Sequence, residues 1–327
     1  MFLKCLGGRS SSERHCRTVI EELCHQFSLG DLRKSTNNFD ECRVIGRGAF
    51  SKVYKGCLQH KDGSDYTVAV KRFDVEYSQV FKKEIELLCQ LHHPNCVSLI
   101  GFCNHQKEKI IVYEYMSNGS LDRHLLYGQL SWKKRMEICI GVARALHYLH
   151  TGAKRSIFHC ILRASTILLD DRMEPKLTGF GLSVQGPRFN SKPKQINPDH
   201  IMGILGYTPL EYVMDGTITD KWDVFSFGFV LLQLVCGINY SIISADREPV
   251  EKNIDPNIKG KITPECWQVF TDIMVRCFKY APDERPTMGE VEVEFEHALC
   301  LQEQADITNT NSDYTLFSKT IISIARE

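Results

Sequence analysis

The spacing of hydrophobic positions changes partway along the chain. Between residues 42 and 73, short runs rich in Val, Tyr, Phe and Gly, such as CRVIGRGAFSKVYKG and YTVAVKRF, predict strands joined by a glycine turn. The segment FKKEIELLCQL, 81–91, carries apolar residues at helical spacing, and the runs VSLIGF and KIIVYEYM after it predict two more strands. From residue 131 onward the period is mainly helical. There SWKKRMEICIGVARALHYLH predicts a long amphipathic helix with Ser131 as its N-cap.

This change of period divides the chain into four parts. We expect a flexible N-terminal arm at 1–38 with a short helix around SLGDLRKST, a small strand-rich lobe at 39–116, a larger helical lobe at 117–302 and a polar tail at 303–327. A loop at 183–206 interrupts the helical part, and long loops inside compact domains are often functional. The expected fold class is α+β, with an antiparallel sheet and one helix in the small lobe.

Composition and charge narrow the classes of function. Lys plus Arg and Asp plus Glu both number 40, so the formal net charge is zero, and neither nucleic acid nor an acidic membrane is expected as the main partner. The 14 Cys residues are scattered singly, which favours reduced intracellular thiols over a disulfide framework or a zinc site. The longest apolar run, 225–238, is too short to span a bilayer and holds Gln233, so it predicts a buried core helix.

A glycine-rich turn lies at the start of the strand-rich part. The segment IGRGAFSKVYKG places Gly46 and Gly48 after a strand, where backbone N–H groups can approach a phosphate. Ser51 replaces the third glycine of G-x-G-x-x-G, so a plain β-turn is the alternative. VAVK, ending in Lys71, follows at strand spacing, and Glu84 follows on the predicted helix. Such a lysine and glutamate can form an ion pair that aims the ammonium at phosphates.

Four further motifs follow in the order that protein kinases show. They are GFG at 179–181, GYTPLEY at 206–212, DVFSFG at 223–228 and RPTM at 285–288. Together with the glycine turn and VAVK, they make the chain resemble a eukaryotic protein kinase from about residue 39 to residue 300. The resemblance implies the bilobal protein-kinase fold.

Within that superfamily the chain is similar to one plant group. The segments FSLGDLRKSTNNFDECRVIGRG, HPNCVSLIGFC, YMSNGSLDRHL and IDPNIKGKITPEC resemble plant receptor-like kinases of the malectin-like receptor group. Those receptors carry an ectodomain and a membrane helix, and this chain has neither, so it resembles a receptor-like cytoplasmic kinase. We expect a cytoplasmic location, including the inner face of the plasma membrane. The chain would reach the membrane through partners or through acylation of Cys5. For Cys5 an ordinary thiol is the favoured alternative.

The family's catalytic loop, H-R-D-x-K-x-x-N, falls on FHCILRASTILLDD, 158–171, and its chemistry is missing there. His159 keeps the first position. Cys160, Ile161, Arg163 and Thr166 stand for the Arg, Asp, Lys and Asn, and Gly179 stands for the Asp of D-F-G. In the family the Asp of this loop accepts the substrate proton and the Lys steadies the phosphoryl group. The Asn and the Asp of D-F-G hold Mg²⁺. General base catalysis typically raises a rate about 100- to 10,000-fold, and a metal ion contributes several kcal/mol of charge stabilisation. Because the residues that supply both are replaced, we expect no intact catalytic residue and no metal site.

Other parts of the family's pattern are retained. The resemblance implies nucleotide contacts from Ile45, Gly46, Gly48, Val53, Ala69, Lys71, Glu84, Glu114 and Met116, which makes ATP without Mg²⁺ a candidate cofactor. It also implies a hydrophobic stack of Leu88, His159 and Phe180, a loop anchor at Asp223 and an ion pair of Glu211 with Arg285. Tyr113 falls at the gatekeeper position before the hinge, where an aromatic residue narrows the back pocket or is plain core. Each has a structural alternative: the Lys71–Glu84 pair helps to assemble the small lobe even without ATP.

Three hypotheses for function follow. The first is a pseudokinase that serves as a signalling scaffold or allosteric partner of another protein kinase or receptor-like kinase. It depends on the joint losses described above and on Ile204, which replaces the usual Ser or Thr of the activation loop. The second is an ATP-dependent serine/threonine kinase with weak or atypical activity, which would need a substitute carboxylate; Asp170 and Asp171 are nearest in sequence. The third is a switch that binds ATP without Mg²⁺.

Overall fold

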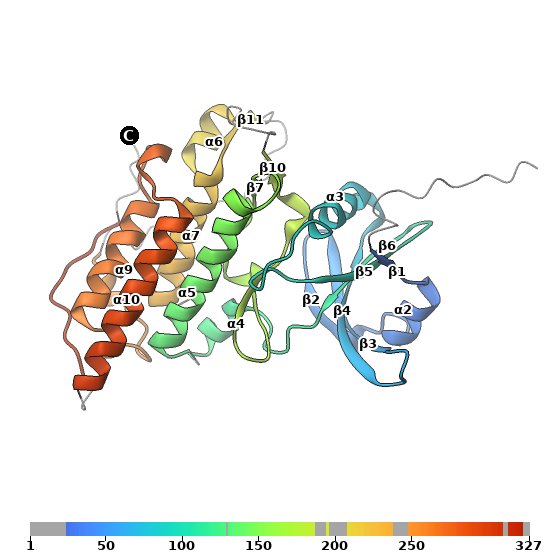
Figure 1. Cartoon of the computed structure of the whole chain (residues 1–327), viewed down its shortest axis with the longest axis horizontal. Coiled ribbons are helices and arrows are strands. Elements are labelled where there is room, and N and C mark those ends of the chain that lie inside the picture. The colour runs from blue at the N-terminus through green and yellow to red at the C-terminus, as the bar shows by residue number, and fades with distance from the viewer. Residues whose placement is uncertain are drawn as a thin grey trace, which may run out of the picture.

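The alternating segments in the first part of the chain form one six-stranded sheet, which builds the small lobe (Figure 1). The structure is a computed structural model that describes residues 24–128, 130–186, 194–195, 208–237, 248–309 and 313–322. The strands are β1 (His25–Gln26), β2 (Val44–Arg47), β3 (Ser51–Gln59), β4 (Asp65–Phe73), β5 (Leu99–His105) and β6 (Glu108–Glu114). Their order is β1-β5-β6-β4-β3-β2, and every neighbouring pair is antiparallel except β1 with β5.

The two faces of this sheet pack against different helices. Val68 and Val70 of β4 lie in a buried cluster with Leu32 of α2 (Leu29–Ser35). Because successive strand residues point to opposite faces, Ala69 and Lys71 lie on the other face, which α3 (Ser78–Leu88) covers. The face toward α3 therefore carries the residues that the sequence assigned to nucleotide binding.

The stretch before residue 39 is part of the small lobe. The short helix expected around SLGDLRKST is present as α2, and its N-cap Ser28 accepts a hydrogen bond from the backbone of Asp31. However, residues 25–26 pair with β5, and a Cβ at Gly101 would lie 2.3 Å from the carbonyl oxygen of His25, so only glycine permits this approach. The expectation of a flexible arm up to residue 38 is thus wrong for residues 25–35. Residues 1–23, including Cys5, lie outside the described residues.

A disulfide joins this N-terminal stretch to α3. It links Cys24, just before β1, to Cys89, the C-cap residue of α3. The expectation of reduced thiols throughout is therefore wrong for this pair, which no regular Cys spacing in the sequence had indicated. The other cysteines in the described part of the chain carry free thiols.

The second part of the chain forms the helical large lobe (Figure 1). Its helices are α4 (Leu121–Leu126), α5 (Trp132–His147), α6 (Leu210–Asp215), α7 (Asp220–Cys236), α9 (Pro264–Cys277) and α10 (Met288–Thr308). Short antiparallel pairs join β7 (Ile157–Phe158) with β10 (Val184–Gln185), β8 (Ile167–Leu169) with β9 (Pro175–Leu177), and β11 (Lys194–Gln195) with β12 (Thr217–Ile218). The α+β class and the two-lobed kinase fold are thereby confirmed.

The helices of the large lobe pack around aromatic side chains. Trp132 of α5, Phe270 of α9 and Phe295 of α10 form successive ring contacts. The predicted N-cap Ser131 accepts a hydrogen bond from Lys134 N. Helix α7 is buried from Trp222 to Val235, which confirms that the apolar run at its centre is a core helix. No helix in the described ranges is long and apolar enough to cross a membrane.

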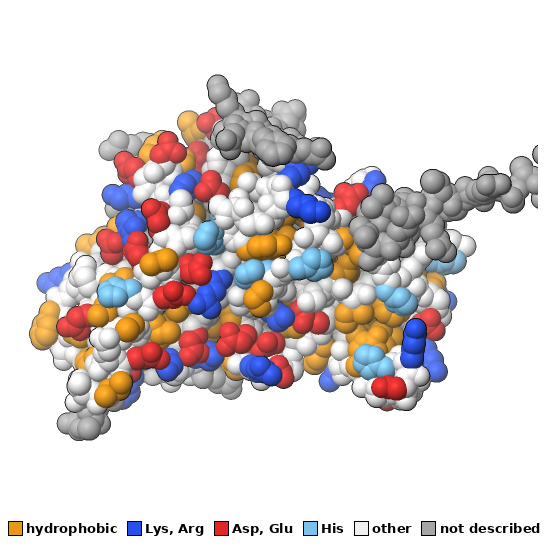
Figure 2. Space-filling model, viewed as in Figure 1, with side chains coloured by type: hydrophobic (Ala, Val, Ile, Leu, Met, Phe, Trp, Pro, Cys, Tyr) orange, Lys and Arg blue, Asp and Glu red, His pale blue; other side chains and the backbone are white. Residues whose placement is uncertain are grey.

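The end of the chain also departs from the expectation. Helix α10 continues to Thr308, and residues 313–322 lie along the large lobe, with Ile322 only 1% exposed. A polar tail beginning at residue 303 is therefore wrong. Most of the expected loop at 183–206, including Ile204, lies outside the described residues. Figure 2 shows acidic and basic side chains interspersed on the face in view, in keeping with the balanced composition.

Candidate functional site between the lobes

A buried carboxylate connects three elements of the small lobe. Glu84 of α3 is fully buried, and its two oxygens lie 2.9 and 2.7 Å from the Nζ atom of Lys71 on β4. The hydroxyl of Tyr113 on β6 donates a hydrogen bond to Oε1 of Glu84 at 2.6 Å. Burial, together with the neighbouring carboxylate, raises the pKa of Tyr113 well above its usual value, so the hydroxyl remains a donor. These bonds hold α3 against the sheet.

A hydrophobic stack connects α3 to the large lobe. Leu88, His159 and Phe180 are all buried, and the rings of His159 and Phe180 meet edge to face with centroids 5.4 Å apart. The Nε2 atom of His159 lies 2.9 Å from the carbonyl oxygen of Thr178, and Nδ1 is buried without a partner in the described structure. Burial lowers the pKa of His159, so the ring is neutral and donates from Nε2. The arrangement makes His159 a packing residue.

Asp223 holds the backbone at the start of the former catalytic loop. Its carboxylate accepts hydrogen bonds from the backbone N–H groups of His159 at 2.7 Å and Cys160 at 2.8 Å, and from His150 Nε2 at 2.9 Å. Cys160 has a φ of +66°, an uncommon conformation for a residue with a side chain, and these bonds stabilise it. Burial raises the pKa of the Cys160 thiol well above its usual value, so it is not a reactive thiolate.

The residues that replace the family's catalytic groups meet at one point. Gly179 has a φ of +92°, and a Cβ on it would lie 3.3 Å from Cδ1 of Ile161 and 3.5 Å from Cγ2 of Thr166. The hydroxyl of Thr166 is turned to the local backbone, where it accepts from Arg163 N and lies 2.9 Å from Arg163 O. Two methyl groups thus lie beside the place where a side chain on residue 179 would begin.

This point does not fit a divalent cation. Mg²⁺ requires oxygen ligands, and Ile161, Gly179 and the methyl group of Thr166 offer none there. Asp170 is no substitute: its carboxylate accepts from the backbone of Arg172 and Glu174 in the β8–β9 turn, and Gly179 follows the opposite end of that hairpin. No group of three or more His, Cys, Asp or Glu side chains that could hold a metal occurs among the described residues.

The nucleotide-side residues lie together on the strands near Lys71. In the sheet register Val53 of β3 is the direct partner of Lys71, and Ala69 is the partner of Tyr113. A bulge at Ile45 separates two registers of β2 with β3, and Gly46 pairs with Val53. The apolar side chains and the ammonium suit an adenine ring and phosphates, so these residues fit a nucleotide although the metal position does not fit a cation.

Two residues that the sequence assigned to nucleotide contacts already have hydrogen-bond partners within the protein. The N–H of Gly48 donates to the carbonyl of Ser51 at 2.9 Å and closes the glycine turn. The carboxylate of Glu114 accepts from Ser98 N at 2.7 Å and from Lys176 Nζ at 3.0 Å, and the backbone N–H of Glu114 donates to the carbonyl oxygen of Ser98 at 3.2 Å, so these groups of the hinge residue already have partners within the protein. Met116, the other hinge residue, is 7% exposed. Arg163 is exposed at the start of a short 3-10 turn, 164–166.

A buried ion pair ties α6 to the base of the large lobe. Arg285 contacts both oxygens of Glu211, at 2.6 and 3.0 Å, and its side chain is 1% exposed. It also donates to the backbone carbonyls of Lys279 and Tyr280 and lies over the Phe225 ring. With so many fixed partners, the pair is a structural element.

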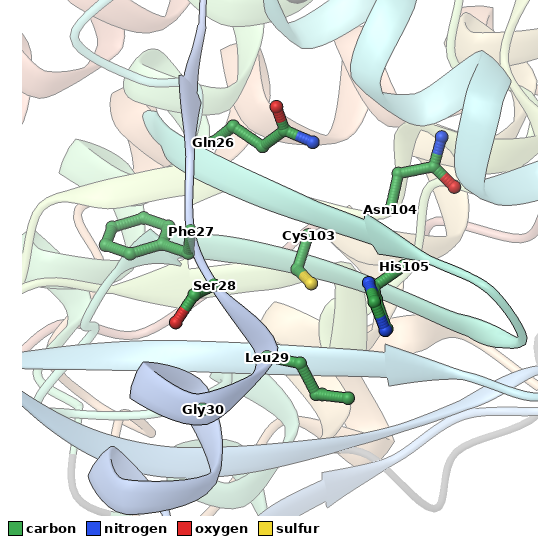
Figure 3. A pocket seen from close by; sticks show the side chains of 8 residues that line it. All are labelled: Gln26, Phe27, Ser28, Leu29, Gly30, Cys103, Asn104 and His105. Atoms are coloured by element: carbon green, nitrogen blue, oxygen red, sulfur yellow. The ribbon is translucent and has the colours of Figure 1, made fainter. Parts of the chain in front are cut away.

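A separate hollow lies on the outer face of the small lobe. Figure 3 shows this pocket of about 530 Å³ between the β1–α2 segment and the end of β5, lined by residues that include Phe27, Leu29, Cys103 and His105. Cys103 belongs to the cluster on the α2 side of the sheet, so the pocket is not part of the interlobe site.

The hydroxyl of Tyr113 is the main feature of the site that sequence reasoning missed. An aromatic residue before the hinge was expected to narrow the pocket or to pack in the core, and its bond to Glu84 was not foreseen. The available signal was the choice of Tyr, whose hydroxyl needs a partner when it is buried.

Comparisons with known proteins show the family that this chain resembles. Residues 39–295 match the family described as protein tyrosine and serine/threonine kinase. The receptor-like protein kinase ANXUR2 of Arabidopsis thaliana is 41% identical over 322 residues, which cover 92% of this chain and 37% of that protein. The receptor-like protein kinase FERONIA of Arabidopsis thaliana is 41% identical over 313 residues, which cover 89% of this chain and 34% of that protein. The chain therefore spans little more than a third of the length of these relatives.

Proposed function

The chain belongs to the protein tyrosine and serine/threonine kinase family, with a kinase domain of the plant receptor-like type, and from this premise we propose that it is a pseudokinase that acts by binding a partner. One observation carries the proposal. Ile161, Thr166 and Gly179 meet in space, and the atoms nearest to a Cβ placed on Gly179 are methyl carbons of Ile161 and Thr166, 3.3 and 3.5 Å away. The losses therefore affect one site rather than three unrelated positions.

The chemical consequence is severe for phosphoryl transfer. Ile161 has no atom that can accept the proton of a substrate hydroxyl, and positioned general base catalysis typically contributes about 100- to 10,000-fold. Among the described residues no carboxylate contacts the position of a Cβ on Gly179, so a metal ion that would neutralise the charge on the transferring phosphoryl group has no ligand there. Because these groups act together, their absence need not be additive, but either loss would suppress turnover.

The retained contacts support a scaffold. Lys71, Tyr113 and Glu84 hold α3 inward, Asp223 fixes the loop at Cys160, and the hydrophobic stack joins the lobes. None of these contacts needs a nucleotide, a metal or a phosphorylated loop. A rigid, kinase-shaped surface is what a signalling scaffold or allosteric partner would present.

The proposal includes a cofactor and a class of partner. Val53, Ala69 and Lys71 would hold ATP without Mg²⁺, with the Lys71 ammonium as the cation for its phosphates. The partners would be other protein kinases or receptor-like kinases, with no role for nucleic acid. A cytoplasmic location at the inner face of the plasma membrane, reached through such a partner or an acylated Cys5, belongs to the same proposal.

Phosphoryl transfer from labelled ATP tests the proposal. The purified chain is assayed with Mg²⁺ and then with Mn²⁺, on itself and on a general protein substrate, with Lys71→Ala as the matched control. Circular dichroism establishes that both proteins are folded. We expect no transfer above the control. Transfer clearly above it would overturn the pseudokinase assignment.

The second candidate is a serine/threonine kinase with weak or atypical activity. The intact Lys71–Glu84 pair favours it, since active kinases need this contact. If the assay detects no transfer, calorimetric ATP binding with Mg²⁺ and with a chelator separates the remaining hypotheses. Binding that persists in the chelator supports a nucleotide-responsive switch, and no binding leaves a scaffold that works without nucleotide.

A further inference from the structure

The segment 313–322, called the strap from here on, crosses the large lobe in an extended conformation. Its residues alternate between two environments: Tyr314, Leu316, Ser318, Thr320 and Ile322 are partly or fully buried, and the intervening residues are exposed. A period of two is that of an extended chain with one face on a surface. The strap lies on the side of the large lobe away from the small lobe (Figure 1) and joins no sheet in the described structure.

Both ends of the strap are attached to the lobe. At the first end, the N–H of Tyr314 donates to the carbonyl of Gly260 at 2.9 Å, and its hydroxyl donates to Asp306 on α10 at 3.0 Å. At the other end, Ile322 is buried in the core cluster of the large lobe, against which Leu316 also packs. The strap therefore covers an apolar surface of the lobe.

Glu251 holds the centre of the strap. This residue lies in the 3-10 turn Val250–Asn253, and its Oε1 atom accepts from the hydroxyls of Ser318 at 3.1 Å and Thr320 at 2.8 Å. Its Oε2 atom accepts from the N–H of Thr320 at 2.9 Å. The indole N–H of Trp267 donates to the same carboxylate at 3.0 Å. Within the described part of the chain no ion pair to Glu251 occurs, and the donors to its carboxylate there are neutral hydroxyl, amide and indole groups.

We propose that Thr320, with Ser318 beside it, is a phosphorylation site that releases the strap. Modification would remove the hydroxyl donor and place a phosphate, which carries nearly two negative charges, against the Glu251 carboxylate. Like charges at this distance repel, and among the described residues no cation is bonded to Glu251 to offset the repulsion. The bonds that fix the strap are those that the modification would break.

The reaction is ordinary phosphoryl transfer by a separate, active protein kinase with its own bound ATP. The Oγ atom of Thr320 attacks the γ-phosphorus, the Oγ–P bond forms, and the bond to the β-phosphate oxygen breaks with departure of ADP. The hydroxyl proton passes to the catalytic carboxylate of that kinase. This chain supplies only the hydroxyl, so the inference does not depend on whether its own cleft is active.

Release would uncover part of the large lobe. With the strap detached, the apolar side chains that pack beneath Leu316 and Ile322 would be exposed to water. The strap is then an intramolecular cover, controlled from the Glu251 contact.

Site-specific phosphorylation within the full chain tests whether phosphate at residue 320 releases the strap from Glu251. Phosphoserine is incorporated at position 320 in one protein and at position 315 in a matched control, because Thr315 is exposed on the outward face of the same strap. Amide hydrogen exchange is measured over 313–322 and at Val250, whose N–H donates to the carbonyl of Thr320. We expect exchange about tenfold faster or more for the 320 protein alone, since a hydrogen bond to a charged group contributes at least that factor.

Glu251→Gln provides an internal check. In the unmodified chain it should accelerate exchange of the strap, whereas with phosphoserine at 320 it should slow exchange, because the like-charge repulsion is removed. Equal exchange for the 315 and 320 proteins would overturn the proposed release of the strap. Acceleration of exchange by Glu251→Gln both in the unmodified chain and in the chain with phosphoserine at 320 would also overturn it.

A second experiment tests whether the site is modified. The full chain and a synthetic peptide of residues 313–322 are incubated with Mg-ATP and an active receptor-like serine/threonine kinase domain, and phosphate is located by mass spectrometry. Phosphate on Thr320 or Ser318 of the full chain is expected. Phosphate on the peptide alone, on neither sample, or only at other hydroxyls of the chain would overturn the proposal.

Discussion

The hydroxyl of Tyr113 donates a 2.6 Å hydrogen bond to Oε1 of Glu84, the same oxygen that the Lys71 ammonium contacts at 2.9 Å. Tyr113 and Lys71 thus share one buried carboxylate. This explains why contacts within the protein alone hold α3 inward. The relationship also makes the stability of the small lobe open to direct tests.

Removal of the Tyr113 hydroxyl should loosen α3 without changing the shape of the core. Tyr113→Phe is expected to lower the free energy of unfolding by about 1.5 kcal/mol, the lower end for a hydrogen bond to a charged group, since Lys71 still satisfies Glu84. Urea denaturation and hydrogen exchange of α3 measure the effect. Tyr115→Phe, at the neighbouring hinge position, is the control and should be near neutral. Equal losses for the two variants would contradict a role for the Tyr113 bond.

The Lys71–Glu84 pair should stabilise the fold in the absence of any nucleotide. Lys71→Ala leaves a fully buried carboxylate with only Tyr113 as partner, and breaking a buried pair typically costs about 3 kcal/mol or more. Thermal and urea unfolding of nucleotide-free protein would measure this loss. Lys82→Ala, on the exposed side of the same helix, should change stability by less than about 0.5 kcal/mol. An unaffected Lys71→Ala protein would show that the pair is not structural.

Restoration of the three missing groups together should restore metal-dependent chemistry. The triple variant Ile161→Asp, Thr166→Asn and Gly179→Asp is expected to transfer phosphate at least about 100-fold above the natural chain, the lower range for a positioned base. An aspartate at the φ of +92° found for Gly179 should cost about 1 kcal/mol of stability, which a melting curve would reveal. Ile161→Asp alone, without metal ligands, is the control and should remain inactive. A folded but inactive triple variant would locate the main defect elsewhere.

Burial of neutral His159 should make stability depend on pH. Its pKa in the folded state is lowered below the ordinary value of 6.5, so the contribution is complete above pH 6.5 and is lost as pH falls through the folded pKa. As the pH falls from 6.5 to the folded pKa, the free energy of unfolding is expected to decrease. The slope corresponds to at most one more proton bound by the unfolded state than by the folded state. His159→Phe, which keeps an aromatic ring beside Phe180, should flatten the profile. Parallel profiles for the two proteins would exclude His159 as the source.

Much of the fold was predictable because its signals are local. Period-two runs around Val68 and Lys71, followed by helical spacing around Glu84, predict the strands and the helix that the structure contains. The order of motifs identifies the kinase fold, and the absence of acids at Ile161 and Gly179 is evident from the letters alone. The expected flexible arm and polar tail differ from the structure at residues 25–35, 303–308 and 313–322, because polar composition was taken to mean a free chain.

The contacts of the two chain ends show why composition misled. The strap places Ser318 and Thr320 on its buried face, where polar residues are unexpected unless a partner satisfies them. That partner is Glu251, 69 positions before Thr320 in the chain. A pairing over such a distance has no signature in a local pattern, since it depends on how the large lobe folds.

By itself, the sequence determined which chemical groups are present. It shows no proton acceptor at residue 161 and no carboxylate at 179, and it shows that Lys71 and Glu84 are retained. Only the tertiary structure decided where those groups point: methyl groups converge at Gly179, and Tyr113 completes the shell of Glu84. The physical reason is that the presence of a group is a property of one residue. A hydrogen bond or a packed contact requires distances that are set by strands and helices far apart in the chain.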